Sequence, residues 1–416
     1  MRTKIHRGAQ EIGGSCIEVE SQGERIVLDV GRPITARLGE DVPLPEIPGL
    51  AEGDDPSLHG VVLSHSHPDH FGLIPKVGGA VPIFMGEAAH RILAQAAFFS
   101  PGGLECSPAA FLRHRKAFGL GPFTITPYLN DHSAFDAYSL MIEADGRRLF
   151  YTGDIRAHGR KAKVFEELIN APPKDIDVLL MEGTNLRADT TASESGPSER
   201  DVERACIETM RSSPGIVLAM FSPQNIDRLV TIFRATLQSD RELVIDLYAA
   251  AVAAATGRGT IPQAEWDRVR VYLPKAQKAK VIRSRSFHRT DAVGRSRIYP
   301  EELVERKGEL VLLFRESMAR EIEEIGCLKG AHAIWSMWPG YLREKSGQRF
   351  KAWLDRMQIP LHHHHASGHA YLPDLQRLVD ALAPGRIVPI HSFEGDRFSE
   401  FFPRVDRRDD GEWWEV

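Results

Sequence analysis

The chain has 416 residues and a formal net charge of −5, with 42% hydrophobic and 26% charged residues. These values exclude disordered and fibrous classes and predict a globular protein with more than one core, because single cores rarely exceed about 250–300 residues. A net negative charge argues against a nucleic-acid binder that relies on overall basicity, so any polyanion must be held by a local basic patch or by metal ions.

The cysteine pattern and the first residues predict a cytoplasmic protein. The four cysteines lie far apart and form no C-x-x-C pair, which disfavours a disulfide framework or a thiolate zinc site. The first six residues lack the apolar core of a signal peptide. No apolar run approaches the roughly 20 residues needed to span a bilayer, so we expect no membrane association.

Short strands interrupted by glycines are predicted over residues 1–190. The predicted strands are 15–20, 25–30, 60–64, 147–152 and 178–181, and helical periodicity appears at 87–99 and 163–169. Several of these strands end at a polar or charged residue. Because loops at strand ends often carry the functional groups of a rigid scaffold, we expect a site at one edge of the sheets.

The middle of the chain changes character after a polar break at 187–200, which is rich in turn formers. The elements predicted after the break are a helix at 198–210 with Ser198 as its N-cap, a strand at 216–220, a helix at 225–237 and a strand at 243–246. Strands that alternate with helices predict a parallel α/β layer.

Residues 275–300 are basic. The cations are Lys275, Lys278, Lys280, Arg283, Arg285, Arg289, Arg295 and Arg297. A solvated face is the simpler interpretation of this run, and a basic patch that follows a nucleic-acid strand is the alternative.

The last part of the chain returns to strands and loops. A helix is predicted at 372–382 and a strand at 387–390, which ends at His391. The run His362–His365 is internal, and it fits either a polar strand edge or side chains that alternately face the site.

The sequence His65-Ser66-His67-Pro68-Asp69-His70 places four metal-binding side chains directly after a buried strand. Imidazole and carboxylate suit zinc or a similar divalent ion. Four potential ligands in six residues are enough to begin two adjacent metal sites.

This H-x-H-x-D-H signature resembles that of the metallo-β-lactamase superfamily, which implies an αββα sandwich. Further residues match the family pattern in order. The resemblance implies that Asp29 supports the histidine loop, that His132 is a ligand and that Asp154 is a carboxylate bridging the two metals. Such a shared carboxylate holds two cations about 3.5–4 Å apart.

Three further motifs resemble motifs A, B and C of the β-CASP branch, and most of all the ribonuclease J type. They are Glu182-Gly183-Thr184-Asn185, Ser367-Gly368-His369-Ala370 and Pro389-Ile390-His391. In this branch an α/β domain is inserted between motifs A and B, which implies a first metallo-β-lactamase part at 1–194, a β-CASP-like insert at 195–350 and a final part with motifs B and C at 351–416. Two departures are Gly183, where serine is common, and the short sequence after motif C. The latter implies that the C-terminal domain of bacterial ribonuclease J is absent, so the oligomeric state stays open, with a homodimer as one expectation.

The resemblance also implies roles for these residues. One ion is expected on His65, His67, His132 and Asp154, and the other on Asp69, His70, His391 and Asp154. Zinc is favoured for both, with manganese as the alternative. Ser367, Gly368 and His369 are expected to bind substrate, His369 as a phosphate contact or acid. Glu182 is expected to orient a ligand histidine, and Asp69 to accept a proton.

The implied function is hydrolysis of single-stranded nucleic acid, RNA before DNA, by exonucleolytic or endonucleolytic cleavage through a hydroxide held between the metals. A cleft lined with basic and aromatic side chains is expected to hold the strand. Two alternatives stay open. The first is a hydrolase of small lactones or esters with the same fold, and the second is a binding subunit without catalysis.

Overall fold

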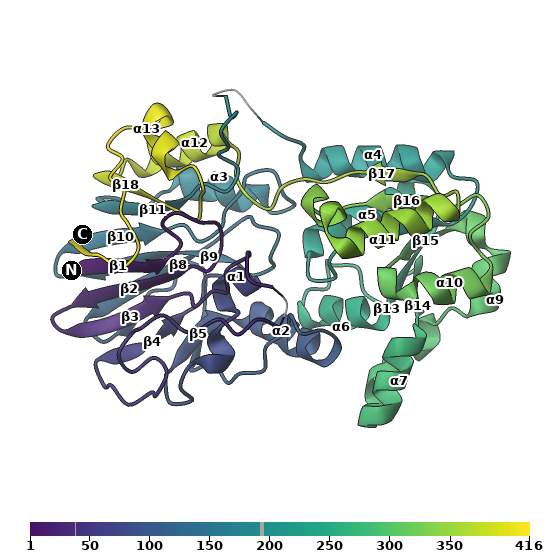
Figure 1. Cartoon of the computed structure of the whole chain (residues 1–416), viewed down its shortest axis with the longest axis horizontal. Helices are drawn as coiled ribbons and strands as arrows, with labels where there is room; N and C mark the ends of the chain where they lie inside the picture. The colour runs from purple at the N-terminus through teal and green to yellow at the C-terminus, as the bar shows by residue number, and fades with distance from the viewer. Residues whose placement is uncertain (38, 192–194) are drawn as a thin grey trace. The chain divides into compact units, whose positions relative to one another are not determined.

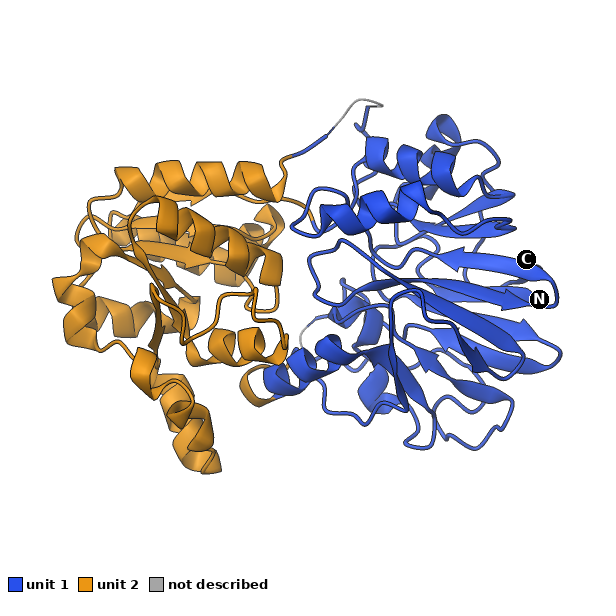
Figure 2. Cartoon of the chain, turned by 180° about the vertical axis from the view of Figure 1, so that it is seen from behind, with its two compact units in different colours: residues 1–97, 102–196, 368–416 blue, residues 98–101, 197–367 orange. Residues whose placement is uncertain are grey.

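The structure is a computed structural model of the whole chain, and it describes residues 1–37, 39–191 and 195–416 (Figure 1). It contains two compact units, coloured separately in Figure 2. Unit 1 comprises 1–97, 102–196 and 368–416, and unit 2 comprises 98–101 and 197–367. The polar break predicted at 187–200 includes residues 192–194, which lie outside the described part. The domain boundaries predicted after residues 194 and 350 stay predictions.

Unit 1 contains two sheets, and the first has seven strands. In spatial order they are β19 (Trp413–Glu415), β1 (Arg2–Arg7), β2 (Cys16–Ser21), β3 (Glu24–Leu28), β4 (Leu58–Val62), β5 (Ile83–Gly86) and β6 (Ala110–Leu112). The strands from β3 to β6 run parallel to one another. Their carboxyl ends therefore lie at one edge of the sheet.

The second sheet of unit 1 has six strands. In spatial order they are β18 (Arg386–Ile390), β11 (Val178–Glu182), β10 (Arg147–Tyr151), β9 (Tyr138–Ala144), β8 (Phe123–Leu129) and β7 (Phe118–Leu120). The parallel trio β10, β11 and β18 aligns Glu182 with Ile390, so residues far apart in sequence end their strands side by side.

The two sheets pack face to face, and short helices cover their outer faces. Between the sheets lies an apolar core that includes Val19, Val62, Ile125, Leu140 and Val388. The helices of unit 1 are α1 (Pro68–Phe71), α2 (Glu87–Phe99), α3 (Ala162–Asn170), α12 (Leu372–Leu382) and α13 (Phe398–Phe401). Apolar residues of α2 pack on the first sheet and those of α3 and α12 on the second. This arrangement is the predicted αββα sandwich.

Unit 2 contains a six-stranded parallel sheet, as its alternating pattern predicts. The spatial order is β14 (Val269–Tyr272), β13 (Glu242–Asp246), β15 (Leu310–Leu313), β12 (Val217–Met220), β16 (His332–Trp335) and β17 (Leu361–His363). Its helices are α4 (Glu199–Ser212), α5 (Ile226–Gln238), α6 (Leu247–Ala255), α7 (Lys275–Ser284), α8 (His288–Asp291), α9 (Pro300–Glu305), α10 (Ala319–Ile325) and α11 (Lys345–Arg356). Apolar clusters line both faces of the sheet.

A local signal explains where α4 begins. Ser198 caps α4 in a capping box, because its hydroxyl accepts the amide of Asp201 and the Asp201 carboxylate accepts the amide of Ser198 at 2.9 Å. Short 3₁₀ helices occupy Ile74–Lys76, Gly294–Ser296, Lys307–Glu309, Glu316–Met318, Pro339–Arg343 and Gly395–Arg397. Across the described residues, no helix has both the length and the apolar character needed to cross a membrane.

Candidate metal centre

The ends of six strands bring the predicted site residues together within unit 1. The residues that directly follow β3 and β18 are Asp29 and His391. The loop after β4 leads into α1, which carries the rest of the histidine motif. Asp154 follows β10, Glu182 ends β11, and His132 lies in the loop between β8 and β9. Each side chain is therefore placed by rigid sheet backbone.

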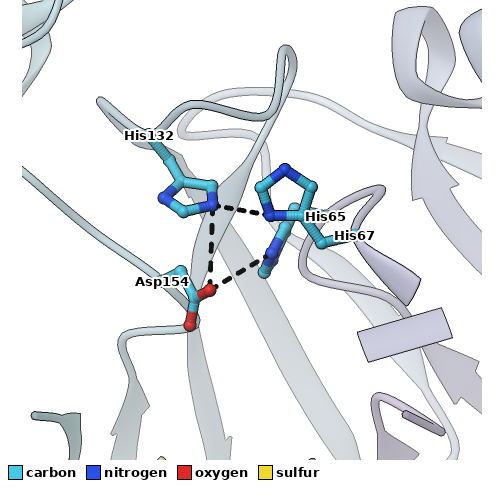
Figure 3. Close-up of side chains that lie close together, drawn as sticks. All are labelled: His65, His67, His132 and Asp154. Atoms are coloured by element: carbon cyan, nitrogen blue, oxygen red, sulfur yellow. Dashed lines mark hydrogen bonds and ion pairs between the residues drawn. The ribbon is translucent and has the colours of Figure 1, made fainter. Parts of the chain in front are cut away.

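Potential ligands form two groups of four that share the Asp154 carboxylate, and a third group, Asp154, Glu182 and His369, adjoins them. Atoms of the first group, His65, His67, His132 and Asp154, all lie within 4.8 Å of one another (Figure 3). The second group, Asp69, His70, His391 and Asp154, meets the same distance. These are the two sets that the resemblance implies.

Asp154 faces both groups with different oxygens. Its Oδ2 lies 3.4 Å from Nε2 of His65 and 3.7 Å from Nε2 of His132. Its Oδ1 lies 3.3 Å from Nε2 of His70 and 3.8 Å from Nε2 of His391. A buried carboxylate divided in this way has the form needed to bridge two cations.

Five buried atoms that point into the cluster have no hydrogen-bond partner among the described residues. They are Nε2 of His65, His70 and His391 and both carboxylate oxygens of Asp154. An unsatisfied buried polar atom costs about 1–3 kcal/mol, and more where it is charged. Imidazole nitrogen and carboxylate oxygen are the donors that divalent transition metals prefer. The residues of the cluster therefore fit divalent metal ions.

In three of the proposed ligand histidines, Nδ1 contacts another group of the protein. Nδ1 of His70 lies 2.8 Å from Oδ2 of Asp29, and Nδ1 of His132 lies 2.6 Å from the carbonyl oxygen of Gly368. Nδ1 of His65 lies 3.0 Å from the Ser64 hydroxyl. Such contacts fix the ring orientation and leave Nε2 free for a metal.

Asp29 holds the histidine loop through several donors. Its carboxylate accepts the amide of Ser64 at 2.7 Å and the hydroxyl of Tyr151 at 2.6 Å, in addition to its contact with His70. Asp29 has a φ of +58°, in the left-handed region. This conformation does not continue a strand, so β3 ends at the preceding residue, Leu28. His391 has φ +51° and also directly follows a strand. Positive φ at two non-glycine site residues is strain of the kind found at functional sites.

The electrostatics of the cluster favour neutral imidazoles and an ionised carboxylate. Burial lowers the pKa of His67 to about 3, and burial also lowers the pKa values of His132 and His391. Although burial opposes ionisation, the surrounding histidines hold the pKa of Asp154 well below its usual range. His70 is the exception, since the carboxylates of Asp154 and Asp29 outweigh burial and raise its pKa. Apart from that of His70, these are the protonation states that metal ligands require.

His369 and Glu182 form a pair beside the two groups. Nδ1 of His369 lies 3.1 Å from Oε1 of Glu182 and 3.8 Å from Oδ2 of Asp154. Burial alone lowers the pKa of His369, but the Glu182 and Asp154 carboxylates raise it to about 9. The imidazole is 20% exposed, whereas Glu182 is fully buried. The carboxylate that was expected to orient a ligand histidine thus contacts His369.

The remaining residues of the Ser-Gly-His motif divide between the two units. Ser367 is the last residue of unit 2. Gly368 begins the final part of unit 1, where a Cβ atom on it would lie 2.7 Å from the Ser133 hydroxyl oxygen. A glycine is therefore needed for its carbonyl to reach His132.

The run His362–His365 belongs to unit 2 and contributes to neither ligand group. His362 lies on β17 and stacks on His332, with Nε2 and Nδ1 of the two rings 3.3 Å apart. His364 contacts the Thr209 hydroxyl at 2.8 Å.

Two further site residues were missed in the sequence. Arg156 is completely buried, and its Nε lies 3.4 Å from Oδ1 of Asp131, next to His132. The amide of Arg156 also donates to the carbonyl of Asp131 at 2.7 Å. This contact braces the loop that carries His132. Both residues could have been identified from their place in the sequence, because each lies within two positions of a predicted ligand.

Comparisons with known proteins agree with this geometry. Residues 25–214 match the Beta-lactamase superfamily domain. An RNase J-like protein of Methanocaldococcus jannaschii is 24% identical over 59% of this chain and 57% of its own length. Ribonuclease J of Corynebacterium glutamicum is 26% identical over 92% of this chain and 52% of its own. RNase aCSPSF2 of Saccharolobus solfataricus is 26% identical over 53% of this chain and 45% of its own.

The chain spans about half the length of these curated relatives. Among solved structures, a protein of unknown function from Enterococcus faecalis V583 superposes on this chain with a TM-score of 0.76 at 20% sequence identity. The superposition covers 99% of both chains. This likeness shows a common fold over the whole length, insert included.

Proposed function

We propose that the chain is a member of the β-CASP branch of the metallo-β-lactamase superfamily and, from this premise, that it is a two-metal phosphodiesterase that hydrolyses single-stranded nucleic acid, RNA in preference to DNA. The observation that carries the proposal is the division of Asp154 between two ligand groups, in which inward atoms of Asp154, His65, His70 and His391 have no hydrogen-bond partner among the described residues. A hydrolase that polarises a phosphodiester from two cations needs such a shared carboxylate.

Each ion has a defined ligand set in this proposal. His65, His67, His132 and Asp154 would hold one ion, and Asp69, His70, His391 and Asp154 would hold the other. When bound, the two ions would supply positive charge for the phosphoryl oxygens and would lower the pKa of a bound water. Zinc fits the imidazole-rich first set, and manganese is the alternative.

The protein residues handle protons and position the phosphate. The Asp69 carboxyl is 19% exposed and lies 3.6 Å from Nε2 of His391, so it can accept the proton of the attacking water. His369 is partly exposed, and the Glu182 carboxylate, 3.1 Å from its Nδ1, favours the protonated form of its imidazole. A protonated imidazole there stabilises negative charge on the phosphoryl oxygens and can donate a proton to the leaving oxygen.

The choice of RNA rests on the relatives. Three of them are named as ribonucleases, and the one that covers most of this chain aligns through the insert as well as the sandwich. A hydrolase of small lactones needs no such insert. Ser367 and Gly368, which precede His369, are proposed to contact the substrate backbone.

The test is incubation of the purified protein with single-stranded RNA and DNA that carry either a 5′-phosphate or a 5′-hydroxyl. We expect RNA to be degraded, degradation to stop with a chelator, and His67→Ala to be inactive. The pattern of products distinguishes removal of successive nucleotides from internal cleavage.

Two results would overturn the proposal. Degradation that persists after chelation and in His67→Ala would exclude the metal centre as its source. Intact oligonucleotides together with rapid hydrolysis of a lactone or an ester would assign the site to a small-molecule hydrolase instead.

A further inference from the structure

Residues 275–297 of unit 2, which we call the basic arm, concentrate positive charge in an acidic protein. Eight lysines and arginines and one aspartate give the segment a formal net charge of +7. Since the whole chain carries −5, the rest of it carries −12. A charge separation of this size creates a local field that attracts polyanions despite the overall charge.

The helix α7 in the basic arm makes little contact with the body of unit 2. Val281 is the one buried residue of this ten-residue helix, and the helix projects from the unit in Figure 1. Lys278, Arg283 and Arg285 are exposed. Among the described residues, no carboxylate forms an ion pair with any of these three cations, whereas Lys275 at the base pairs with Glu324 at 2.8 Å.

Apolar and aromatic side chains lie among the cations. Ile282 is 54% exposed and Phe287 is 51% exposed. The Arg289 guanidinium lies 4.3 Å from the centre of the Phe98 ring, and Nζ of Lys280 lies 5.3 Å from it. Cations beside one exposed ring, Phe287, and one half-buried ring, Phe98, are the elements of a surface that contacts phosphates and stacks on bases.

We propose that the basic arm is a binding site for single-stranded nucleic acid, in which Lys278, Arg283 and Arg285 contact phosphates and Phe287 stacks on a base. The choice of partner rests on the proposed function. Among polyanions, an anionic membrane surface fits less well, because a helix that lies on a membrane needs one broad apolar face. At 3.6 residues per turn, Lys278 and Arg283 lie on different sides of α7, and Val281 is already buried.

The test compares two triple variants in a His67→Ala background, which holds the RNA intact. The arm variant is Lys278→Gln, Arg283→Gln and Arg285→Gln. The matched control is Arg343→Gln, Lys345→Gln and Lys351→Gln, which removes the same charge from exposed positions elsewhere in unit 2. The measurement is the fluorescence anisotropy of a labelled single-stranded oligoribonucleotide at increasing salt concentration.

The arm variant is expected to bind at least about tenfold more weakly than the parent, and its slope of log affinity against log salt should fall by about 2, at ~0.7 per phosphate contact. The control should stay within about twofold of the parent. Equal affinities of the arm variant and the parent overturn the inference. Binding of the parent to phosphatidylserine vesicles but not to RNA overturns it as well.

A separate measurement distinguishes this inference from the proposed function. Hydrolysis of bis(p-nitrophenyl) phosphate by the wild-type protein reports on the metal centre without requiring the arm. If neither this ester nor RNA is hydrolysed, the proposed function fails, while the affinity comparison of the two triple variants still decides whether the arm binds RNA.

Discussion

The two units bury charged side chains in opposite ways. In unit 1, atoms of Asp154, His65, His70 and His391 point toward a common centre, and within the described part of the chain they have no hydrogen-bond partner. In unit 2, Arg228 is equally buried, but its guanidinium bonds to both oxygens of Glu199, at 3.0 and 3.2 Å, and to the Ser336 carbonyl and hydroxyl, both at 2.6 Å. Glu199 also accepts the Thr231 hydroxyl at 2.6 Å.

The cluster around Asp154 has buried polar atoms that a bound ligand could contact, whereas the hydrogen-bond network around Arg228 is already complete. Buried charge is tolerated when it is paired and hydrogen-bonded, as around Arg228. The cluster around Asp154 meets that condition only when cations occupy it. Burial alone therefore does not identify a functional site, whereas the convergence of several unsatisfied ligand atoms on one point does.

The largest effect is expected for Asp154→Asn, which removes the shared charge of the two ligand groups. Because a metal contributes several kcal/mol to the transition state and each 1.36 kcal/mol is tenfold in rate, activity on RNA should fall by about a thousandfold or more. Metal content and kcat are the measurements. A variant that keeps both its metals and its activity would show that the Asp154 carboxylate is not the shared ligand of the two ions.

Glu199→Gln tests the complete network. Loss of one partner from a buried ion pair costs about 3–5 kcal/mol, so the unfolding free energy of unit 2 should fall by that amount. Chemical denaturation followed by signals from each unit is the measurement. Glu309→Gln is the control, because Glu309 is 62% exposed in its pair with Arg306 and should change stability by about 0.5 kcal/mol or less. Equal effects of the two substitutions would contradict the role assigned to Arg228.

Removal of the metals should affect the two units unequally. A ligand at a hundredfold its Kd stabilises the folded state by about 2.7 kcal/mol, and chelation removes this contribution. Hydrogen exchange should increase at the strand ends around His65 and His391, while the strands of unit 2 should be unaffected. Uniform loss of protection in both units would mean that the metals do not act through this cluster.

Asp29→Asn should weaken metal binding without removing a ligand. The carboxylate orients His70, and loss of such a contact costs about 10–100-fold in metal affinity. Tyr151→Phe, which removes one of the hydrogen bonds to the same carboxylate, should cause a smaller loss. Competition with a chromophoric chelator gives both affinities, and the order of the two variants is the decisive result.

The smallest effect concerns a paired charge within unit 1. Although burial opposes it, hydrogen bonds from His6 and Arg25 lower the pKa of Glu18. A depressed folded-state pKa gives stability above the unfolded pKa, about 4.3, and this stability is lost as the pH falls through the folded value. The wild-type protein should therefore lose its advantage over Glu18→Gln as acid is added. A difference in unfolding free energy that stays constant with pH would contradict the assignment.

The parts of the site that are local in sequence could be predicted from it. The motif from His65 to His70 lies within one loop and one helical turn, so its proximity follows from the chain itself. Asp29, His132 and Asp154 were found through family order, and the fold class followed from the same resemblance. The ligand roles of all these residues stay predictions.

Long-range contacts could not be predicted. Glu182 and His369 are 187 positions apart, and their pairing depends on which strands are neighbours in the sheet. Strand ends were also misplaced. The strand predicted at 60–64 is observed as β4 at Leu58–Val62, because the Ser64 amide leaves the sheet and donates to Asp29.

Short elements of unit 2 were missed for a different reason. The strands β14 to β17 have three or four residues each, which is too few for a periodicity to emerge. The helix α7 was seen only as a basic run, because one buried residue gives no apolar stripe.

Arg228 also bears on the order in which the protein assembles. Besides Glu199, near the beginning of the insert, its guanidinium donates to the carbonyl of Ala366 at 3.4 Å, near the insert's end. One side chain thus ties together the two points where the chain enters and leaves unit 2. Since each doubling of a flexible loop adds about 0.6 kcal/mol to its closure, early folding of residues 197–367 would shorten the effective loop between β11 and β18 and so lower the cost of pairing them.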